Sequence, residues 1–206
     1  MVMKVSNINM PVFKGNNQTV VAQKSVATNN NVRELNNVTP DFNVKVPQKY
    51  YKTGVEKIPN GLEVHSYKLA NGYRVSIIPM EGSPAMVKNY VSVGSLNETD
   101  DIKGISHFLE HMAFNGTNGE NGYIKLNTGD SFKKIDELGG WTNASTSYAV
   151  TDYVNSTPLL NDKDLETQLK IIAGMTEDLA LTDKMIEKEK GPVCSEINMI
   201  LDDPQT

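Results

Sequence analysis

The amino-acid sequence predicts an α/β fold of the α+β sandwich type, in which helices pack on a mixed, largely antiparallel sheet. Three observations predict it. Strand-like runs with alternating apolar residues come first, from residue 62 to residue 95. Two of these runs are separated by a dipeptide typical of a tight hairpin. A helical apolar period then dominates the last 45 residues or so, and a chain that mixes both kinds of segment forms layers of sheet and helix.

The first strands are expected at Leu62–Ala70 and Tyr73–Met80, on either side of Asn71-Gly72. Asn-Gly is the strongest short-range signal for a two-residue hairpin, because both residues tolerate positive φ angles. A third run, Met86–Ser95, alternates in the same way. The order of these runs favours antiparallel neighbours.

The middle of the chain is expected to hold a helix, a surface loop, a short helix capped by Ser131, and two strands, one of them at a sheet edge. In chain order, these elements are Gly104–Phe114, the Gly- and Asn-rich stretch Asn115–Gly129, Ser131–Leu138, Trp141–Ser147 and Tyr148–Ser156.

Two long helices are expected to follow. From Asp164 to Leu181 the apolar residues recur every three or four positions, as on one face of a helix. Thr182-Asp183 are typical N-terminal residues for the next helix, which is expected to continue to Leu201.

The N-terminal segment has a different composition. Residues 1–45 contain ten asparagines and only two aromatic residues, Phe13 and Phe42. Such a segment buries too little apolar surface to offset its conformational entropy. We therefore expect a mostly disordered arm at 1–45 and one folded domain at 46–206.

Charge and cysteine content exclude several classes of protein. The net charge is −5 over 206 residues and no basic stripe is present, so we expect no nucleic-acid partner. No apolar run approaches the roughly 18 residues that a membrane span needs. Cys194 is the single cysteine, which we expect to be buried as a small apolar residue. The first residues lack a secretory signal, so a cytoplasmic location is expected, with export by another route left open.

The residues His107-Phe108-Leu109-Glu110-His111 form an H-x-x-E-H motif. On a helix, His107 and His111 lie one turn apart on one face, so both imidazoles can bind one ion. Glu110 lies close enough to that face to act on a water beside the ion. This is the reversed form of the H-E-x-x-H zinc motif.

A catalytic zinc needs a third protein ligand and one open position. His65 is one candidate, although the alternation of its strand places it toward solvent. Glu189 and Glu196 are seven residues apart, which is two helical turns, and therefore share a face of the last helix.

Three ordered motifs carry a family resemblance that covers about residues 60–203. Gly104–Thr117 reads GISHFLEHMAFNGT, Gly139–Thr146 reads GGWTNAST, and Glu189 is followed at the seventh position by Glu196 and then Ile197. Together they resemble the pitrilysin/insulinase family of zinc metallopeptidases, which includes the mitochondrial processing peptidases. The fold implied is the processing-peptidase-like metallohydrolase domain.

The resemblance implies a role for each of five residues. His107, His111 and Glu196 are implied to be the ligands of one Zn²⁺ per chain. Glu110 is implied to be the general base, and Glu189 is implied to orient a ligand or the water. The activity implied is zinc-dependent endopeptidase action through a metal-activated water.

Substrate contacts are implied as well. Asn143 and Ala144 match the edge strand whose backbone pairs with an extended peptide or small protein. Phe114 either lines the pocket beside the zinc or packs in the core. The family encloses its substrate between two homologous halves. We therefore expect a second half, either in the same longer chain, of which this sequence would be a fragment, or in trans.

The alternative is a non-catalytic, peptide-binding or regulatory subunit of such a two-half peptidase, but the four primary residues are all present, which favours an enzyme. A structural zinc would usually have more cysteine ligands. Two departures from the family pattern affect the position of Glu196. Gly191-Pro192 lies between Glu189 and Glu196, where a proline removes a helix hydrogen bond and can kink the chain. The interval from His111 to Glu196 is longer than usual, which a loop at Asn118–Gly129 would absorb.

Overall fold

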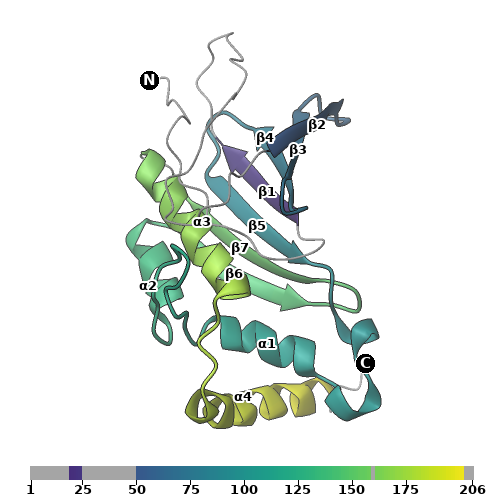
Figure 1. The fold of residues 1–206 in the computed structure, drawn as a ribbon, viewed down its shortest axis with the longest axis vertical. Coiled ribbons are helices and arrows are strands. Elements are labelled where there is room, and N and C mark those ends of the chain that lie inside the picture. Colours follow the sequence, from purple (N-terminus) through teal and green to yellow (C-terminus); the bar gives the residue numbers. More distant parts are fainter. Residues whose placement is uncertain (1–18, 25–49, 159–160, 202–206) are drawn as a thin grey trace.

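The structure is a computed structural model of the 206-residue chain, and it describes residues 19–24, 50–158 and 161–201. Seven strands form one sheet in the order β2-β3-β4-β1-β5-β7-β6, with helices against one side and one end of it (Figure 1). The strands are β1 (Thr19–Lys24), β2 (Tyr50–Lys57), β3 (Glu63–Leu69), β4 (Arg74–Pro79), β5 (Ala85–Val91), β6 (Trp141–Thr146) and β7 (Thr151–Thr157).

All neighbouring strands pair antiparallel except β1 and β4, which are parallel. The mixed, largely antiparallel sheet predicted from the sequence is therefore confirmed. The hairpin between β3 and β4 turns at residues 71–72, but only Gly72 has a positive φ, of 91°. Asn71 instead accepts a hydrogen bond from the backbone N–H of Tyr73 through its side-chain oxygen, at 3.1 Å.

Strand β1 is the main departure from the sequence prediction. It belongs to the arm expected to be mostly disordered, yet it lies between β4 and β5 in the middle of the sheet. Its sequence, TVVAQK, contains the β-branched residues that favour strands. Residues 1–18 and 25–45 of the predicted arm lie outside the described residues. Strand β2, which pairs with β3 and forms one edge of the sheet, was also not predicted as a strand.

The helices are α1 (Ile105–Ala113), α2 (Asp130–Glu137), α3 (Asp162–Glu177) and α4 (Asp183–Leu201), and two 3-10 turns, η1 (Ser95–Asn97) and η2 (Asp100–Ile102), precede α1. Helix α3 packs on β5 and β7. Its apolar side chains complete a core whose buried members are Tyr73, Val75, Val87, Ala113, Tyr123, Leu126, Ile135, Tyr153, Leu165, Leu169, Ile171, Ile172, Ala173 and Met175.

One of the two helix caps predicted from the sequence, Thr182, is confirmed. Asn161 caps α3 by accepting a hydrogen bond from the N–H of Asp164, and Thr182 accepts one from the N–H of Met185 at the start of α4. For α2 the predicted cap was wrong. Gly129 precedes the helix with a φ of 79°, and Ser131 lies inside the helix, buried.

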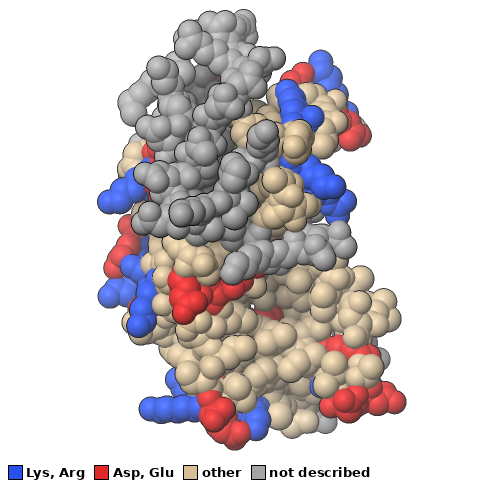
Figure 2. Space-filling view, in the orientation of Figure 1, with Lys and Arg blue, Asp and Glu red and all other residues tan. Residues whose placement is uncertain are grey.

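Helix α1 lies against β6 and β7, and α4 packs against α1 on the side away from the sheet (Figure 1). This arrangement brings the last helix of the described chain to the H-x-x-E-H motif. None of the helices in the described residues is long and apolar enough to span a membrane. On the face drawn in Figure 2, basic side chains are interspersed with acidic ones around the rim and do not gather in one basic area.

Candidate metal centre

The start of α1 is fixed by a carboxylate from outside the helix. Glu98 accepts hydrogen bonds from the backbone N–H groups of Gly104, at 2.7 Å, and Ser106, at 2.8 Å. These two bonds hold the pKa of Glu98 below its ordinary value. They satisfy N–H groups that have no acceptor inside the helix, and the negative charge lies at the positive end of the helix dipole. The first turn of α1, which carries His107, is thus anchored.

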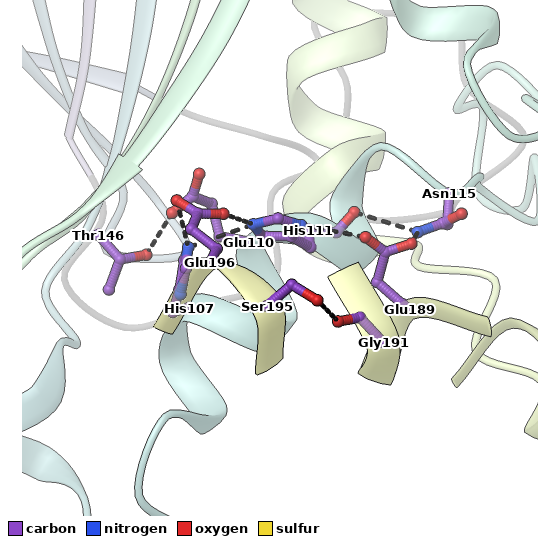
Figure 3. Close-up of polar contacts among 9 residues, drawn as sticks. All are labelled: His107, Glu110, His111, Asn115, Thr146, Glu189, Gly191, Ser195 and Glu196. Atoms are coloured by element: carbon purple, nitrogen blue, oxygen red, sulfur yellow. Dashed lines mark hydrogen bonds and ion pairs between the residues drawn. The ribbon is translucent and has the colours of Figure 1, made fainter. Parts of the chain in front are cut away.

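The two histidines of the motif lie side by side on α1, and their Nε2 atoms are 3.2 Å apart. Glu196 reaches both of them from α4. One of its oxygens lies 3.7 Å from Nε2 of His107, and the other lies 3.3 Å from Nε2 of His111 (Figure 3). One ligand atom from each of the three residues falls within 4.8 Å of the other two. The three side chains are between 22% and 43% exposed, so the cluster is open to small molecules.

The residues present fit a zinc ion. Zinc–nitrogen bonds of about 2.0–2.1 Å in a tetrahedron separate two imidazole nitrogens by roughly 3.3 Å, close to the separation of the two Nε2 atoms. Two unprotonated Nε2 lone pairs facing each other repel unless a proton or a cation lies between them. Two imidazoles and one carboxylate also form a ligand set that catalytic zinc sites use, with a fourth position left for water or substrate.

Glu189 lies outside the cluster of three candidate ligands and contacts one of them, His111. Its Oε1 is 3.0 Å from Nδ1 of His111, and its Oε2 accepts a hydrogen bond of 2.8 Å from the side-chain amide of Asn115. Because a carboxylate can only accept, the geometry assigns a hydrogen to Nδ1 of His111 and leaves the lone pair on Nε2. Helix α4 therefore contacts both nitrogens of one imidazole, Glu189 at Nδ1 and Glu196 at Nε2.

Glu110 is buried against the sheet, with 9% of its surface exposed. The hydroxyl of Thr146, the last residue of β6, donates a hydrogen bond of 2.6 Å to its Oε2 (Figure 3). The neighbouring Tyr153 has a raised pKa, first because it is buried and second because of the negative charge of Glu110. One carboxylate oxygen of Glu110 is thus held by a hydrogen bond that the sequence did not reveal.

The three residues expected to contact substrate lie outside the metal cluster. Asn143 is exposed and Ala144 is half-buried on β6, which is the last strand of the described sheet and pairs on one side only, with β7. Phe114 is half-buried, packs against the core and stacks on Phe132 with ring centroids 4.7 Å apart. Core packing, one of the two roles considered for Phe114, is therefore observed, and its role toward substrate stays a prediction.

The proline in α4 does not remove Glu196 from the cluster. The helix continues through Pro192, and the hydroxyl of Ser195 donates a hydrogen bond to the carbonyl of Gly191. The prediction that Cys194 is buried was wrong, because α4 turns Val193 inward and leaves Cys194 exposed. His65 lies on β3 beside Glu63 and is not part of the cluster.

Two functional candidates were missed by sequence reasoning, Thr146 and Asn115. Both lie inside motifs that were recognised, GGWTNAST and GISHFLEHMAFNGT. Their partners, Glu110 and Glu189, are 36 and 74 residues away in the chain. A motif indicates that such residues belong to the family pattern, but the residues they contact can be identified only from the fold.

Comparison with known proteins agrees with this geometry. The profile of the family described as Insulinase (Peptidase family M16) matches residues 80–206, more than half of the chain. The chain is 33% identical over 145 residues to a protein of Bacillus subtilis named "Uncharacterized zinc protease YmxG", covering 68% of this chain and 32% of that protein. It is also 33% identical over 133 residues to the mitochondrial-processing peptidase subunit beta of Dictyostelium discoideum, covering 64% of this chain and 26% of that protein.

Among solved structures, a protease from Helicobacter pylori matches with a TM-score of 0.57 and 31% identity. That match covers 65% of this chain and 30% of the other. The chain thus spans about a third or less of the length of the relatives it matches. The match of the family profile over residues 80–206 shows that this chain belongs to the insulinase family of peptidases, family M16.

Proposed function

We propose that this chain carries the zinc-binding half of a peptide-hydrolysing site, with His107, His111 and Glu196 as ligands of one Zn²⁺. The observation that carries the proposal is the convergence of these three side chains from α1 and α4, with their ligand atoms within 4.8 Å of one another. The "zinc protease" names of the relatives support it.

A zinc ion, when bound, supplies Lewis acidity toward the scissile carbonyl and lowers the pKa of a water toward about 7. Glu110 accepts the proton of the attacking water and later delivers it to the leaving nitrogen. The hydroxyl of Thr146 restrains one oxygen of Glu110 and leaves the other oxygen to accept the proton. Glu189 orients His111 from the opposite side of the ring.

The substrate in this proposal is an extended peptide that adds to the free edge of β6. Within the described residues, β6 pairs with β7 and with no other strand, and strand addition gives affinity with little dependence on sequence. Asn143 and Ala144 would contact the peptide backbone at this edge, and Phe114 would contact a side chain. A second homologous half, in the same longer chain or in trans, would cover the peptide from the other side.

The test is the zinc content of the purified chain after dialysis, measured by mass spectrometry of the metal. We expect one zinc per chain in the wild type and a loss of stoichiometric zinc in His111→Ala. His65→Ala is the matched control, since it removes the third histidine of the chain from a position outside the cluster. Retention of one zinc per chain in the double variant His107→Ala/His111→Ala would show that the ligand assignment is wrong.

A further inference from the structure

Asn115 occupies a fixed position where α1 ends. It is buried, with 4% of its surface exposed. Its backbone N–H donates to the carbonyl of Met112 at 3.0 Å, and its own carbonyl accepts from the hydroxyl of Thr128 at 3.0 Å. These bonds hold the backbone of Asn115 on both sides, and its side chain points toward Glu189 of α4 (Figure 3).

The side-chain amide of Asn115 contacts both members of the pair formed by His111 and Glu189. Its Nδ2 donates to Oε2 of Glu189 at 2.8 Å and to the backbone carbonyl of His111 at 3.3 Å (Figure 3). An amide nitrogen has two hydrogens, and here each has an acceptor. One side chain thus connects the end of α1 to the outer carboxylate of α4.

Glu189 needs such a second contact. A glutamate has three rotatable side-chain bonds, and one hydrogen bond through Oε1 leaves the plane of the carboxylate free to turn. The bond from Asn115 to Oε2 fixes that plane. With the plane fixed, Oε1 stays 3.0 Å from Nδ1 of His111.

We propose that Asn115 is a positioning residue that acts through Glu189. It holds this carboxylate so that His111 keeps its hydrogen on Nδ1 and presents the lone pair of Nε2 to the metal. The inference rests on the proposed function, because it assigns Asn115 to the same zinc site. Outer partners of this kind typically change metal affinity by about 10–100-fold.

A purely structural role for Asn115, as a cap for the C-terminal end of α1, predicts something different. Loss of a cap would lower the stability of the fold and would leave the state of His111 unchanged in molecules that remain folded. Zinc affinity and the tautomer of His111 therefore distinguish the two roles, whereas a melting temperature alone does not.

The first experiment measures the zinc dissociation constant of the full chain by competition with a chelator. Asn115→Leu keeps the approximate volume of the side chain and removes the donor, and we expect about 10-fold weaker binding. Asn118→Ala is the matched control, since the amide of Asn118 donates to the carbonyl of Leu179 in the same loop region. Its zinc affinity should equal that of the wild type.

A double-mutant cycle then tests whether Asn115 affects zinc affinity through Glu189. In the Glu189→Ala background, Asn115→Leu should cause no further loss of zinc affinity, because the carboxylate it acts on is absent. An equal 10-fold loss in both backgrounds would overturn the inference. Wild-type affinity in Asn115→Leu would also overturn it. If this variant does not fold, Asn115→Ser, which is smaller and cannot reach Glu189, takes its place under the same criteria.

The second readout is the ¹⁵N spectrum of the histidines in the metal-free chain, which contains only three. We expect His111 to carry its hydrogen on Nδ1 in the wild type and to populate both tautomers in Asn115→Leu. An unchanged His111 tautomer in the variant would overturn the inference without affecting the zinc assignment. A wild-type chain that binds no zinc would instead overturn the proposed function, and this inference with it.

Discussion

At the candidate metal centre, three glutamates from two helices meet three different sets of partners. Glu196 faces two imidazole nitrogens, Glu189 faces an imidazole and an amide, and Glu110 faces a hydroxyl. Chemically identical side chains can thus serve as ligand, orienting group and base, because the neighbours of each one differ.

Replacing Glu110 by Gln should leave zinc bound and abolish turnover. Glutamine has nearly the same shape, but its amide cannot accept the proton of the water. The expected loss of kcat is at least the roughly 10²–10⁴-fold typical of general acid–base catalysis. Zinc content and peptide hydrolysis should be measured on the same preparation of a form that turns over peptide, and unchanged hydrolysis would remove Glu110 from the mechanism.

Replacing Thr146 by Val should lower kcat by roughly 10-fold and leave KM and zinc content nearly unchanged. Valine keeps the branched shape but cannot donate to Glu110, and a hydrogen bond to a charged group contributes about 1.5–3 kcal/mol. Thr146→Ser keeps the hydroxyl and is the matched control. Equal kcat in the valine and serine variants would show that the 2.6 Å contact has no part in turnover.

The sequence allowed prediction of the chemical groups of the site better than of the contacts between them. His107 and His111 could be paired because helical spacing alone places them on one face. The approach of Glu196 to both histidines depends on the packing of α4 against α1. No local sequence pattern predicts that packing. Thr146 and Asn115 were missed for the same reason.

Among the elements, the segment before α1 determines where that helix begins. Glu98 spans two N–H groups of the first turn, which places the start of α1 beside the end of the β6–β7 hairpin. In that corner Gly94 lies so close to the hairpin that an added Cβ would come within 2.2 Å of the carbonyl oxygen of Ser147. A side chain at position 94 would therefore push the segment before α1 away from the hairpin.

The stabilising effect of Glu98 should depend on pH with a definite sign. Its pKa is lowered in the folded state, so its contribution is fully present above the ordinary value of 4.5 and is lost as the pH falls through the folded value. At pH 7, Glu98→Gln should lower the free energy of unfolding by about 1 kcal/mol, as loss of a helix cap does.

Urea unfolding of wild type and Glu98→Gln between pH 7 and pH 3 measures this difference, which should shrink at the acidic end. Asp100→Asn is the control. It removes a carboxylate in the adjacent turn η2 whose side chain is 95% exposed, and exposed ion pairs contribute about 0–1 kcal/mol. A difference for Glu98→Gln that stays constant down to pH 3 would contradict the role given to its charge.

Elements with a local signal were predicted well, and elements that depend on distant partners were not. Helix α3 follows from its apolar periodicity and α4 from the capping residues Thr182-Asp183, and the bounds of both lie within a few residues of those expected. Strand β1 was missed because its six residues acquire order from pairing with β4 and β5, far along the chain. The Gly129 start of α2 was missed because a serine near a helix start is the more common signal.

For the molecule as a whole, the proposed function includes a second half that faces the metal centre. We expect the 206-residue chain to fold and bind zinc, yet to hydrolyse peptides poorly by itself. Donors that stabilise the transition state from a second half would be missing, and the loss of even one such donor typically costs about 10²–10³-fold in rate. The assay is turnover of a mixed peptide library by the chain with added zinc, with and without a chelator.

Robust, chelator-sensitive turnover by the monomer would show that one domain suffices. The relatives leave room for a second half, since this chain covers about a third or less of their length. Subunit names among them, such as the beta subunit of the mitochondrial-processing peptidase, are consistent with a partner in trans. A chain that binds zinc but needs such a partner would fit the family and the geometry together.

Because α4 packs against α1, an ion bound between them would stabilise the fold. Two of the three candidate ligands lie on α1 and the third lies on α4, and α1 is the element that α4 contacts most. An ion bound by all three would therefore act as a removable cross-link that closes a long loop of the chain, much as a disulfide does. Binding to the folded form alone would stabilise it by about 2.7 kcal/mol at a zinc concentration 100 times the dissociation constant. Zinc binding and the docking of α4 on α1 would then be thermodynamically coupled.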